Sequence, residues 1–221
     1  MPTLYHCISA RSFRVLWMLE ALRLPYDLRV LAFPPRAHGK SFLELNPRGT
    51  VPLFIEGETR MTESAAICEY LALRHSPGVL NVHADEPDFG SYLNYLHMGD
   101  ATLTFPQTLV LRYSRFEPAE RLQPQVVEDY SRWFLSRLRT LEPTLAAHDY
   151  VAADRFTAAD ISVGYALLLA ELLGLHTKFT ASVAAHWQRL RARPSFVRAQ
   201  TAEIAAAIAQ GVSPLPATEM S

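Results

Sequence analysis

The periodicity of apolar residues in this 221-residue chain changes once, near residues 76–88. Before that point, short runs with the two-residue period of strands alternate with helical segments, whereas every long segment after it has the period of a helix. Ser76-Pro77-Gly78 suits the end of a helix, and the residues that follow are polar enough for a linker. The pattern predicts an α/β domain over residues 1–78, a linker over residues 79–86 and an all-α domain over residues 87–221.

The first thirty or so residues predict a β-α-β unit. Residues 3–7 suit a short strand, and apolar residues at i, i+3, i+4 and i+7 from Val15 to Leu22 lie on one face of a helix. Pro25 ends that helix. Apolar and polar residues then alternate over residues 26–30, which is typical of a half-buried strand. Two strands joined by one helix in this way are expected to be parallel.

The next segment completes a thioredoxin-like order of elements. A loop over residues 32–39 precedes a short helix over residues 40–45. Two short strands flank Glu56-Gly57, a spacing that suits a tight hairpin. Thr62 is expected to cap a helix that continues to about His75. The resulting order, β-α-β-α-β-β-α, is that of a thioredoxin-like domain.

The rest of the chain predicts helices only. Thr157 and Asp160 stand three residues apart before an apolar run, which is a capping-box arrangement with Asp in the place of Glu. This signal is structural and not catalytic. The expected helices cover residues 88–115, 123–148, 158–173, 180–192 and 195–209.

Charge and composition exclude several classes of function. The formal net charge of −1 predicts no surface for nucleic acid or for an anionic membrane. The longest apolar stretch, residues 161–175, is interrupted by Glu171 and is shorter than the roughly 20 residues of a membrane span. Cys7 and Cys68 have neither CxxC nor zinc-like spacing. We therefore expect reduced thiols, no metal, no signal peptide and a cytoplasmic location.

Five short motifs stand in a specific order and spacing along the chain. They are Leu4-Tyr5-His6, Ser12-Phe13-Arg14-Val15, Asn46-Pro47-Arg48-Gly49-Thr50-Val51-Pro52-Leu53, Thr62-Glu63-Ser64-Ala65-Ala66-Ile67 and the cap at residues 157–160. None is specific alone, but together they resemble the cytosolic glutathione transferases over essentially the full length of the chain. The resemblance implies a detoxifying, homodimeric enzyme with glutathione as co-substrate and a small hydrophobic electrophile as acceptor.

Two of these motifs would hold glutathione. A cis bond at Val51-Pro52 would turn the backbone N–H and C=O of Val51 outward, where the cysteinyl backbone of glutathione can pair with them. Glu63-Ser64 lies on the first turn of a helix, whose free N–H groups favour an anion. The Ser64 hydroxyl would bind the γ-glutamyl carboxylate, and Glu63 the ammonium group. The plainer alternatives are a strand-starting proline and a carboxylate that complements the helix dipole.

The resemblance implies three further binding residues. His38 and Lys40 lie in the loop where such proteins often hold the glycine carboxylate of glutathione. Asp100 stands where theta-like relatives place an acidic residue that reaches the partner subunit's glutathione. Solvated side chains are the alternative for all three. The electrophile would lie against the predicted helix over residues 88–115.

A hydrogen-bond donor is needed beside the glutathione sulfur, because the thiolate is the nucleophile. A hydroxyl group that binds the sulfur favours this charged form. Ser9 stands where theta-, tau-, phi- and zeta-like relatives place their active serine, and Tyr5 where alpha-, mu- and pi-like relatives place their tyrosine. We prefer Ser9 to Tyr5. Cys7, Ser12 and backbone donors remain alternatives, Cys7 as a thiol that would form a mixed disulfide with glutathione.

Two other functions are compatible with the same motifs. One is a glutathione-dependent disulfide reductase, peroxidase or isomerase on the same fold, for which Cys7 would be the reactive group. The other is a non-catalytic glutathione-binding or regulatory protein. Such a protein would typically lack an intact glutathione anchor, whereas Glu63-Ser64 is intact here.

Overall fold

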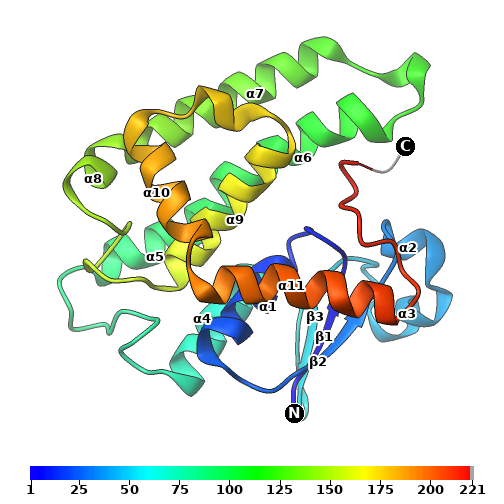
Figure 1. Ribbon diagram of the computed structural model, residues 1–221, viewed down its shortest axis with the longest axis horizontal. Coiled ribbons are helices and arrows are strands. Elements are labelled where there is room, and N and C mark those ends of the chain that lie inside the picture. The colour runs from blue at the N-terminus through cyan, green and yellow to red at the C-terminus, as the bar shows by residue number, and fades with distance from the viewer. Residues whose placement is uncertain (220–221) are drawn as a thin grey trace. The chain divides into compact units, whose positions relative to one another are not determined.

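The computed structural model describes residues 1–219, and its N-terminal part contains one four-stranded sheet (Figure 1). The strand order is β2-β1-β3-β4, with β1 parallel to β2 and antiparallel to β3, and β3 antiparallel to β4. This is the predicted thioredoxin-like arrangement. The strands are β1 (Thr3–His6), β2 (Asp27–Val30), β3 (Leu53–Glu56) and β4 (Thr59–Met61).

The chain divides into two compact units. One unit contains residues 1–76 together with the chain from Ala192 onward, and the other spans residues 77–191. The first therefore includes the last helix, which the sequence pattern places in a domain over residues 87–221. The helices of the first unit are α1 (Phe13–Leu22), α2 (Pro35–His38), α3 (Lys40–Leu45), α4 (Ser64–His75) and α11 (Pro194–Ala209).

The central helix of this unit, α1, is buried on every side over most of its length, from Phe13 to Leu19. The sequence pattern predicts only one apolar face, because the helices that cover the others are distant in the chain. Both α4 and α11 pack along α1. The helix ends at Arg23, whose φ of 53° breaks the helical path two residues before Pro25.

Two local predictions in the first unit are wrong. The segment over residues 32–39 is not all loop, because α2 forms within it with Pro35 at a first-turn position, where proline loses no hydrogen bond. Thr62 is not the cap of α4: the helix begins one residue later, with Glu63 as its N-cap. The Thr62 hydroxyl instead accepts a hydrogen bond from Arg48 at 3.2 Å.

The start of α11 docks on α1 through aromatic side chains. The ring of Phe196 lies 5.0 Å from that of Trp17 and 5.4 Å from that of Phe13, both in edge-on geometry that aromatic pairs favour. The Trp17 Nε1–H donates to the Ser195 hydroxyl at 3.1 Å. Figure 1 shows the helix running past α1 and the strands. These buried contacts are the physical reason that α11 belongs with the sheet.

The end of α11 closes one edge of the sheet. The strand β2 is an edge strand, so its outer backbone groups have no neighbouring strand. The Gln210 side chain accepts from the Val30 N–H at 2.9 Å and donates to the Leu28 carbonyl at 2.8 Å. A side-chain amide thus takes the place of a peptide group in a further strand, which satisfies the edge.

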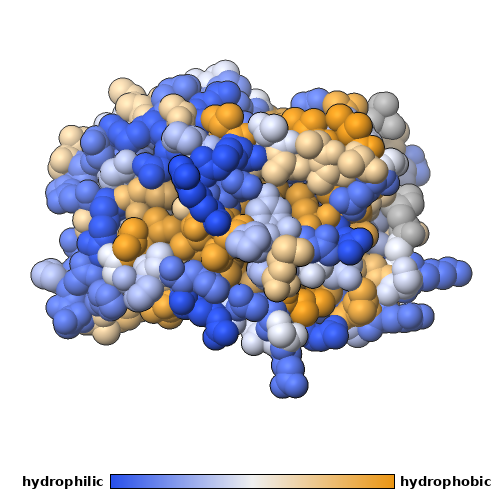
Figure 2. Space-filling model, turned by 60° about the horizontal axis from the view of Figure 1, so that its bottom comes forward, coloured by the Kyte–Doolittle hydropathy of each residue, from blue (hydrophilic) through white to orange (hydrophobic). Residues whose placement is uncertain are grey.

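The outward side of α11 is apolar as well. Val197, Ile204 and Ile208 are exposed along it. Figure 2 shows hydrophobic residues gathered between hydrophilic ones on the face of the molecule that it displays.

The second unit is built around α9, which matches the helix predicted over residues 158–173. Every residue of this helix from Ala158 to Ala170 is buried. The predicted capping box is confirmed: Thr157 accepts from the Ala159 N–H at 3.3 Å, and Asp160 accepts from the Thr157 N–H at 2.9 Å. The helices of this unit are α5 (Phe89–His97), α6 (Phe105–Leu111), α7 (Pro124–Leu138), α8 (Glu142–Ala147), α9 (Ala158–Leu172) and α10 (Ala181–Arg191).

The predicted helix over residues 88–115 is interrupted by π-helical turns. One such segment, η1 (Met98–Thr104), separates α5 from α6, and a second, η2 (Arg112–Phe116), follows α6. Within the described chain, no helix is long and apolar enough to cross a bilayer.

Close packing of η1 on α9 depends on Gly99. A Cβ atom at this position would lie 2.5 Å from both the carbonyl carbon and the hydroxyl oxygen of Ser162. Real side-chain atoms do not approach so closely, so any larger residue would push the two helices apart.

We predict that Gly99→Ala destabilises the protein by about 1–3 kcal/mol through overpacking, which lowers the melting temperature by roughly 2–12 °C in calorimetry. Gly90→Ala is the matched control, because Gly90 is also helical and nothing lies within 4 Å of its added Cβ. That change should stabilise the protein by about 0.5–1 kcal/mol. Equal melting temperatures for the two variants would contradict the packing argument.

Candidate functional site

The start of α4 presents an anion-binding geometry. Its N-cap, Glu63, makes no side-chain capping bond, and within residues 1–219 no partner is found for the N–H groups of the first turn, Ser64 to Ala66. Such N–H groups and the positive end of the helix dipole attract a carboxylate. The Glu63 side chain is exposed, so its carboxylate is open to a cation of the same ligand.

A buried arginine supports the Ser64 hydroxyl. Ser64 is 3% exposed, and its Oγ accepts a hydrogen bond from Nη1 of Arg14 at 3.0 Å. Arg14 itself is completely buried. Because the guanidinium only donates, the Ser64 proton must point elsewhere and is free for an incoming carboxylate. The buried positive charge also favours an anion there.

The turn before β3 leaves a backbone group available. The Val51–Pro52 peptide bond is cis. Val51 is partly exposed, and no hydrogen-bond partner for its N–H or C=O is found among the described residues. An extended peptide can therefore pair with Val51 in the manner of an added strand. Val51-Pro52, Glu63 and Ser64 all belong to the sheet-containing unit.

The other predicted binding residues are less constrained. Lys40 is exposed at the first position of α3. The side chain of His38 lies outside the described part of the chain. Asp100 is partly buried in η1 and belongs to the helical unit, not to the unit that carries Glu63 and Ser64.

Tyr5 is a strand residue whose ring packs on a neighbour. It pairs with Arg29 on one side and Leu53 on the other. Its ring lies 5.5 Å from that of Phe42 on α3. Alternation along β1 puts Tyr5 and His6 on opposite faces of the sheet, and His6 is the one that is fully buried.

Ser9 lies in the loop between β1 and α1 and is held from α11. It is partly exposed, and its φ of 52° is in the left-handed region. The Ser9 N–H donates to Oε2 of Glu203 at 2.9 Å, and its hydroxyl donates to Oε1 of the same carboxylate at 3.5 Å. The backbone of Ser9 is thus fixed, whereas the longer hydroxyl bond is weak.

The same carboxylate connects to a buried histidine and serine. His6 Nε2 lies 2.9 Å from Oε2 of Glu203, and His6 Nδ1 lies 2.8 Å from the Ser12 hydroxyl. Ser12 Oγ also accepts from the Cys7 N–H at 3.3 Å. His6 and Ser12 are fully buried and Glu203 is 3% exposed. Ser12 is therefore a structural residue of the loop.

Cys7 is unsuited to redox chemistry in this structure. It is fully buried, and that burial raises the pKa of its thiol to about 12. At neutral pH the reactive thiolate is therefore scarce. Neither Cys7 nor Cys68 takes part in a disulfide. Within residues 1–219, no group of three His, Cys, Asp or Glu side chains is placed to hold a metal ion.

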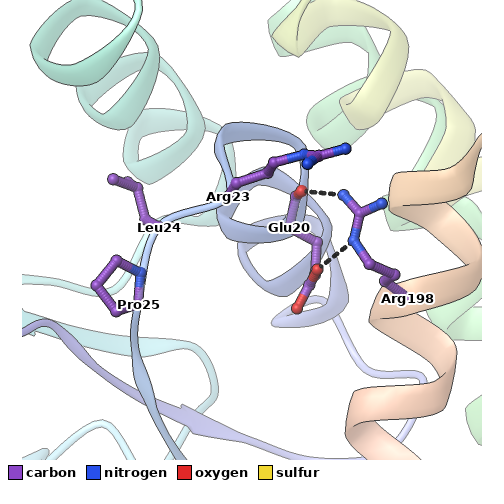
Figure 3. Close-up of a pocket in the computed structure, with 5 residues that line it drawn as sticks. All are labelled: Glu20, Arg23, Leu24, Pro25 and Arg198. Carbon is purple, nitrogen blue, oxygen red and sulfur yellow. Dashed lines mark hydrogen bonds and ion pairs between the residues drawn. The ribbon is translucent and has the colours of Figure 1, made fainter.

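A surface pocket of about 410 Å³ lies where α1 and α11 meet, and Figure 3 shows it. Arg198 points toward Glu20 and donates to its carboxylate at 2.8 Å and to its backbone carbonyl at 2.6 Å. The Tyr26 hydroxyl donates to the same carboxylate at 2.6 Å. Burial and this hydrogen bond raise the pKa of Tyr26. The pocket contains none of the predicted site residues, and its ion pair clamps α11 to α1.

The sequence analysis assigns no role to two residues that support the candidate site. Arg14 supports Ser64, and Glu203 is the partner of Ser9. A signal for Glu203 exists: with Phe196, Ala199 and Ala207 it follows a spacing of three, four and four residues, so it stands on the buried face of its helix. A charged residue on such a face needs a polar partner.

Comparison with known proteins gives one consistent result. Residues 8–74 match the family model described as the N-terminal domain of glutathione S-transferase. Glutathione S-transferase 3 of Schizosaccharomyces pombe is 26% identical over 184 residues, which cover 77% of this chain and 75% of that protein. Glutathione S-transferase 3 of Zea mays is 29% identical over 203 residues, which cover 86% and 88%.

A solved structure shows the same fold along nearly the whole chain. The glutathione transferase URE2P5 from Phanerochaete chrysosporium superimposes with a TM-score of 0.80 at 23% identity, and covers 95% of this chain and 97% of its own. That protein has also been cocrystallised with 1-(S-glutathionyl)-2,4-dinitrobenzene.

The fold and the site geometry define a protein with a thioredoxin-like unit, an open helix start for an anion, and an all-helical unit. Residues 8–74 thus match the N-terminal domain of glutathione S-transferases, and the chain is similar to named glutathione S-transferases over most of its length.

We predict that neither cysteine reacts readily in the native protein. With a pKa of about 12, roughly one Cys7 thiol in 10⁴ is ionised at pH 8, against about a quarter for an unperturbed thiol. Alkylation by iodoacetamide, followed by mass spectrometry, should be at least about 100-fold slower than in the guanidinium-unfolded chain. Rapid native labelling of Cys7 would contradict its burial and reopen the redox alternative.

Proposed function

We propose that this protein is a glutathione transferase that joins the glutathione thiolate to hydrophobic electrophiles. The observation that carries the proposal is the open N-terminus of α4, where Ser64 is supported by the buried Arg14. This site has the charge and donors that a γ-glutamyl carboxylate requires. The cocrystallisation of URE2P5 with a glutathionyl dinitrobenzene supports conjugation as the reaction.

Glutathione would bind the sheet-containing unit at three points. Its γ-glutamyl carboxylate would accept from the Ser64 hydroxyl and the first N–H groups of α4, and its ammonium group would pair with Glu63. Its cysteinyl backbone would pair with the N–H and C=O of Val51. Lys40 and His38 are the proposed partners of the glycine carboxylate.

Ser9 is the proposed partner of the glutathione sulfur. Ser9 is partly exposed, and the bond that its hydroxyl makes to Glu203 is long enough to be exchanged for a bond to sulfur. Tyr5 is less suitable because its ring packs on Phe42. Cys7 is less suitable because it is buried and its pKa is raised to about 12, so redox chemistry is not proposed.

Two further parts of the proposal rest on the resemblance to glutathione transferases alone. The protein acts as a homodimer in which Asp100 contributes to the glutathione site of the partner. The helical unit holds the electrophile.

We predict that Ser64→Ala raises the dissociation constant for glutathione by about 10- to 150-fold, because one hydrogen bond to a charged group contributes about 1.5–3 kcal/mol. Isothermal titration calorimetry measures this. The matched control is Ser76→Ala at the other end of α4, where the hydroxyl donates to the Ala72 carbonyl. Similar affinities of the two variants for glutathione would contradict binding of its γ-glutamyl carboxylate at the start of α4.

Turnover of a chlorinated nitrobenzene with glutathione tests which hydroxyl group binds the glutathione sulfur. We expect Ser9→Ala to lower kcat/KM at least tenfold, which corresponds to about 1.4 kcal/mol of transition-state stabilisation. Tyr5→Phe should stay within about twofold of the wild type. If neither substitution lowers the rate tenfold, the assignment of Ser9 and Tyr5 is wrong. If the wild type itself shows no turnover, the proposed reaction is wrong.

A further inference from the structure

One carboxylate of α11 holds the loop that contains Ser9. Glu203 Oε2 accepts from the Ser9 N–H and lies beside His6 Nε2, both at 2.9 Å, while Oε1 accepts the Ser9 hydroxyl at 3.5 Å. The Glu203 side chain is only 4% exposed. A buried carboxylate with three donors is an organised element of structure and not a solvated charge.

The direction of the hydrogen bonds follows from counting donors and acceptors. The Glu203 carboxylate only accepts, so His6 donates to it from Nε2. In this tautomer His6 Nδ1 accepts from the Ser12 hydroxyl, whose oxygen accepts the Cys7 N–H. Every donor in this chain of bonds thus points toward the same carboxylate.

A Ser–His–Glu series can also form a hydrolase triad, and the structure argues against that function here. Ser12 is completely buried and its Oγ accepts the Cys7 N–H. A substrate carbonyl could not reach this oxygen, because a triad needs an accessible nucleophile. Ser12 and His6 therefore have a structural role. The serine that is partly exposed and bonded to Glu203 is Ser9.

The conformation of the Ser9 backbone needs support from the hydrogen bond to Glu203. Its φ of 52° is a conformation that residues other than glycine seldom adopt. The bond from the Ser9 N–H to Glu203 favours this conformation over extended alternatives. It leaves the hydroxyl, with its longer bond, able to turn its proton toward another acceptor.

We propose that Glu203 is a positioning residue, which sets the Ser9 loop so that the hydroxyl reaches the glutathione sulfur. This inference rests on the proposed function. The N–H bond to Oε2 persists when glutathione binds, whereas the hydroxyl exchanges its bond to Oε1 for a bond to the thiolate. The sulfur site is thus completed by α11, through a carboxylate 194 residues from Ser9.

The first test is a double-mutant cycle with the chlorinated nitrobenzene and glutathione. Glu203→Gln should lower kcat about tenfold and leave the KM for glutathione within twofold, because the anchors at Val51 and Ser64 are untouched. In the Ser9→Ala background, the same substitution should change kcat by less than twofold. A purely structural role would give equal losses in both backgrounds, and that result overturns the proposal.

Glu20→Gln is the matched control. Glu20 also fixes α11, through Arg198 at 2.8 Å, and its carboxylate accepts from Arg198 and Tyr26. Its loss should lower the melting temperature and leave kcat within twofold. A tenfold loss of kcat in Glu20→Gln would show that helix docking alone explains the effect and would overturn the proposal. Glu203→Asp, which keeps the charge but shortens the side chain, is the second variant if Glu203→Gln does not fold. It should show the same loss of kcat.

Amide hydrogen exchange separates this inference from the proposed function. Measured by NMR, exchange of the Ser9 N–H should be at least tenfold faster in Glu203→Gln than in the wild type, and unchanged in Glu20→Gln. Absence of turnover in the wild type would overturn the proposed function, and the exchange rate would still decide the role of Glu203. An unchanged Ser9 exchange rate overturns the positioning role.

Discussion

Docking of α11 on the sheet-containing unit is the interaction on which the rest of this structure depends. Aromatic contacts of Phe196 bury the start of the helix, and the ion pair of Arg198 with Glu20 fixes the next turn. Glu203 then reaches the loop after β1, and Gln210 closes the edge of β2. One helix therefore completes the burial of α1, the conformation of Ser9 and the protection of a sheet edge.

Local sequence signals predict most of the secondary structure because they act within a few residues. The alternation over residues 26–30 and the capping box at Thr157 are both found. The prediction at Thr62 fails because its hydroxyl is engaged by Arg48, 14 residues away. The association of α11 with the sheet was not predictable either: periodicity gives the buried face of a helix but not the surface that covers it.

The same distinction applies to the candidate site. Glu63-Ser64 is found at a helix start and the Val51–Pro52 bond is cis, as the motifs suggest. These features depend on adjacent residues. The contacts that support them do not: Arg14 is 50 residues from Ser64. No local pattern links such partners, and only the fold brings a buried donor to a hydroxyl or a carboxylate to a loop.

The sheet-containing unit is built from two separate stretches of the chain, so its parts are synthesised at different times. At about 5–20 residues per second, the ribosome adds Glu203 roughly 10–40 s after Ser9, a separation of 194 residues. Throughout that interval the outer edge of β2 lacks Gln210, and the loop after β1 lacks its carboxylate. The nascent sheet thus needs protection from pairing with other chains, and the Ser9 loop gains its support only after Glu203 has been added.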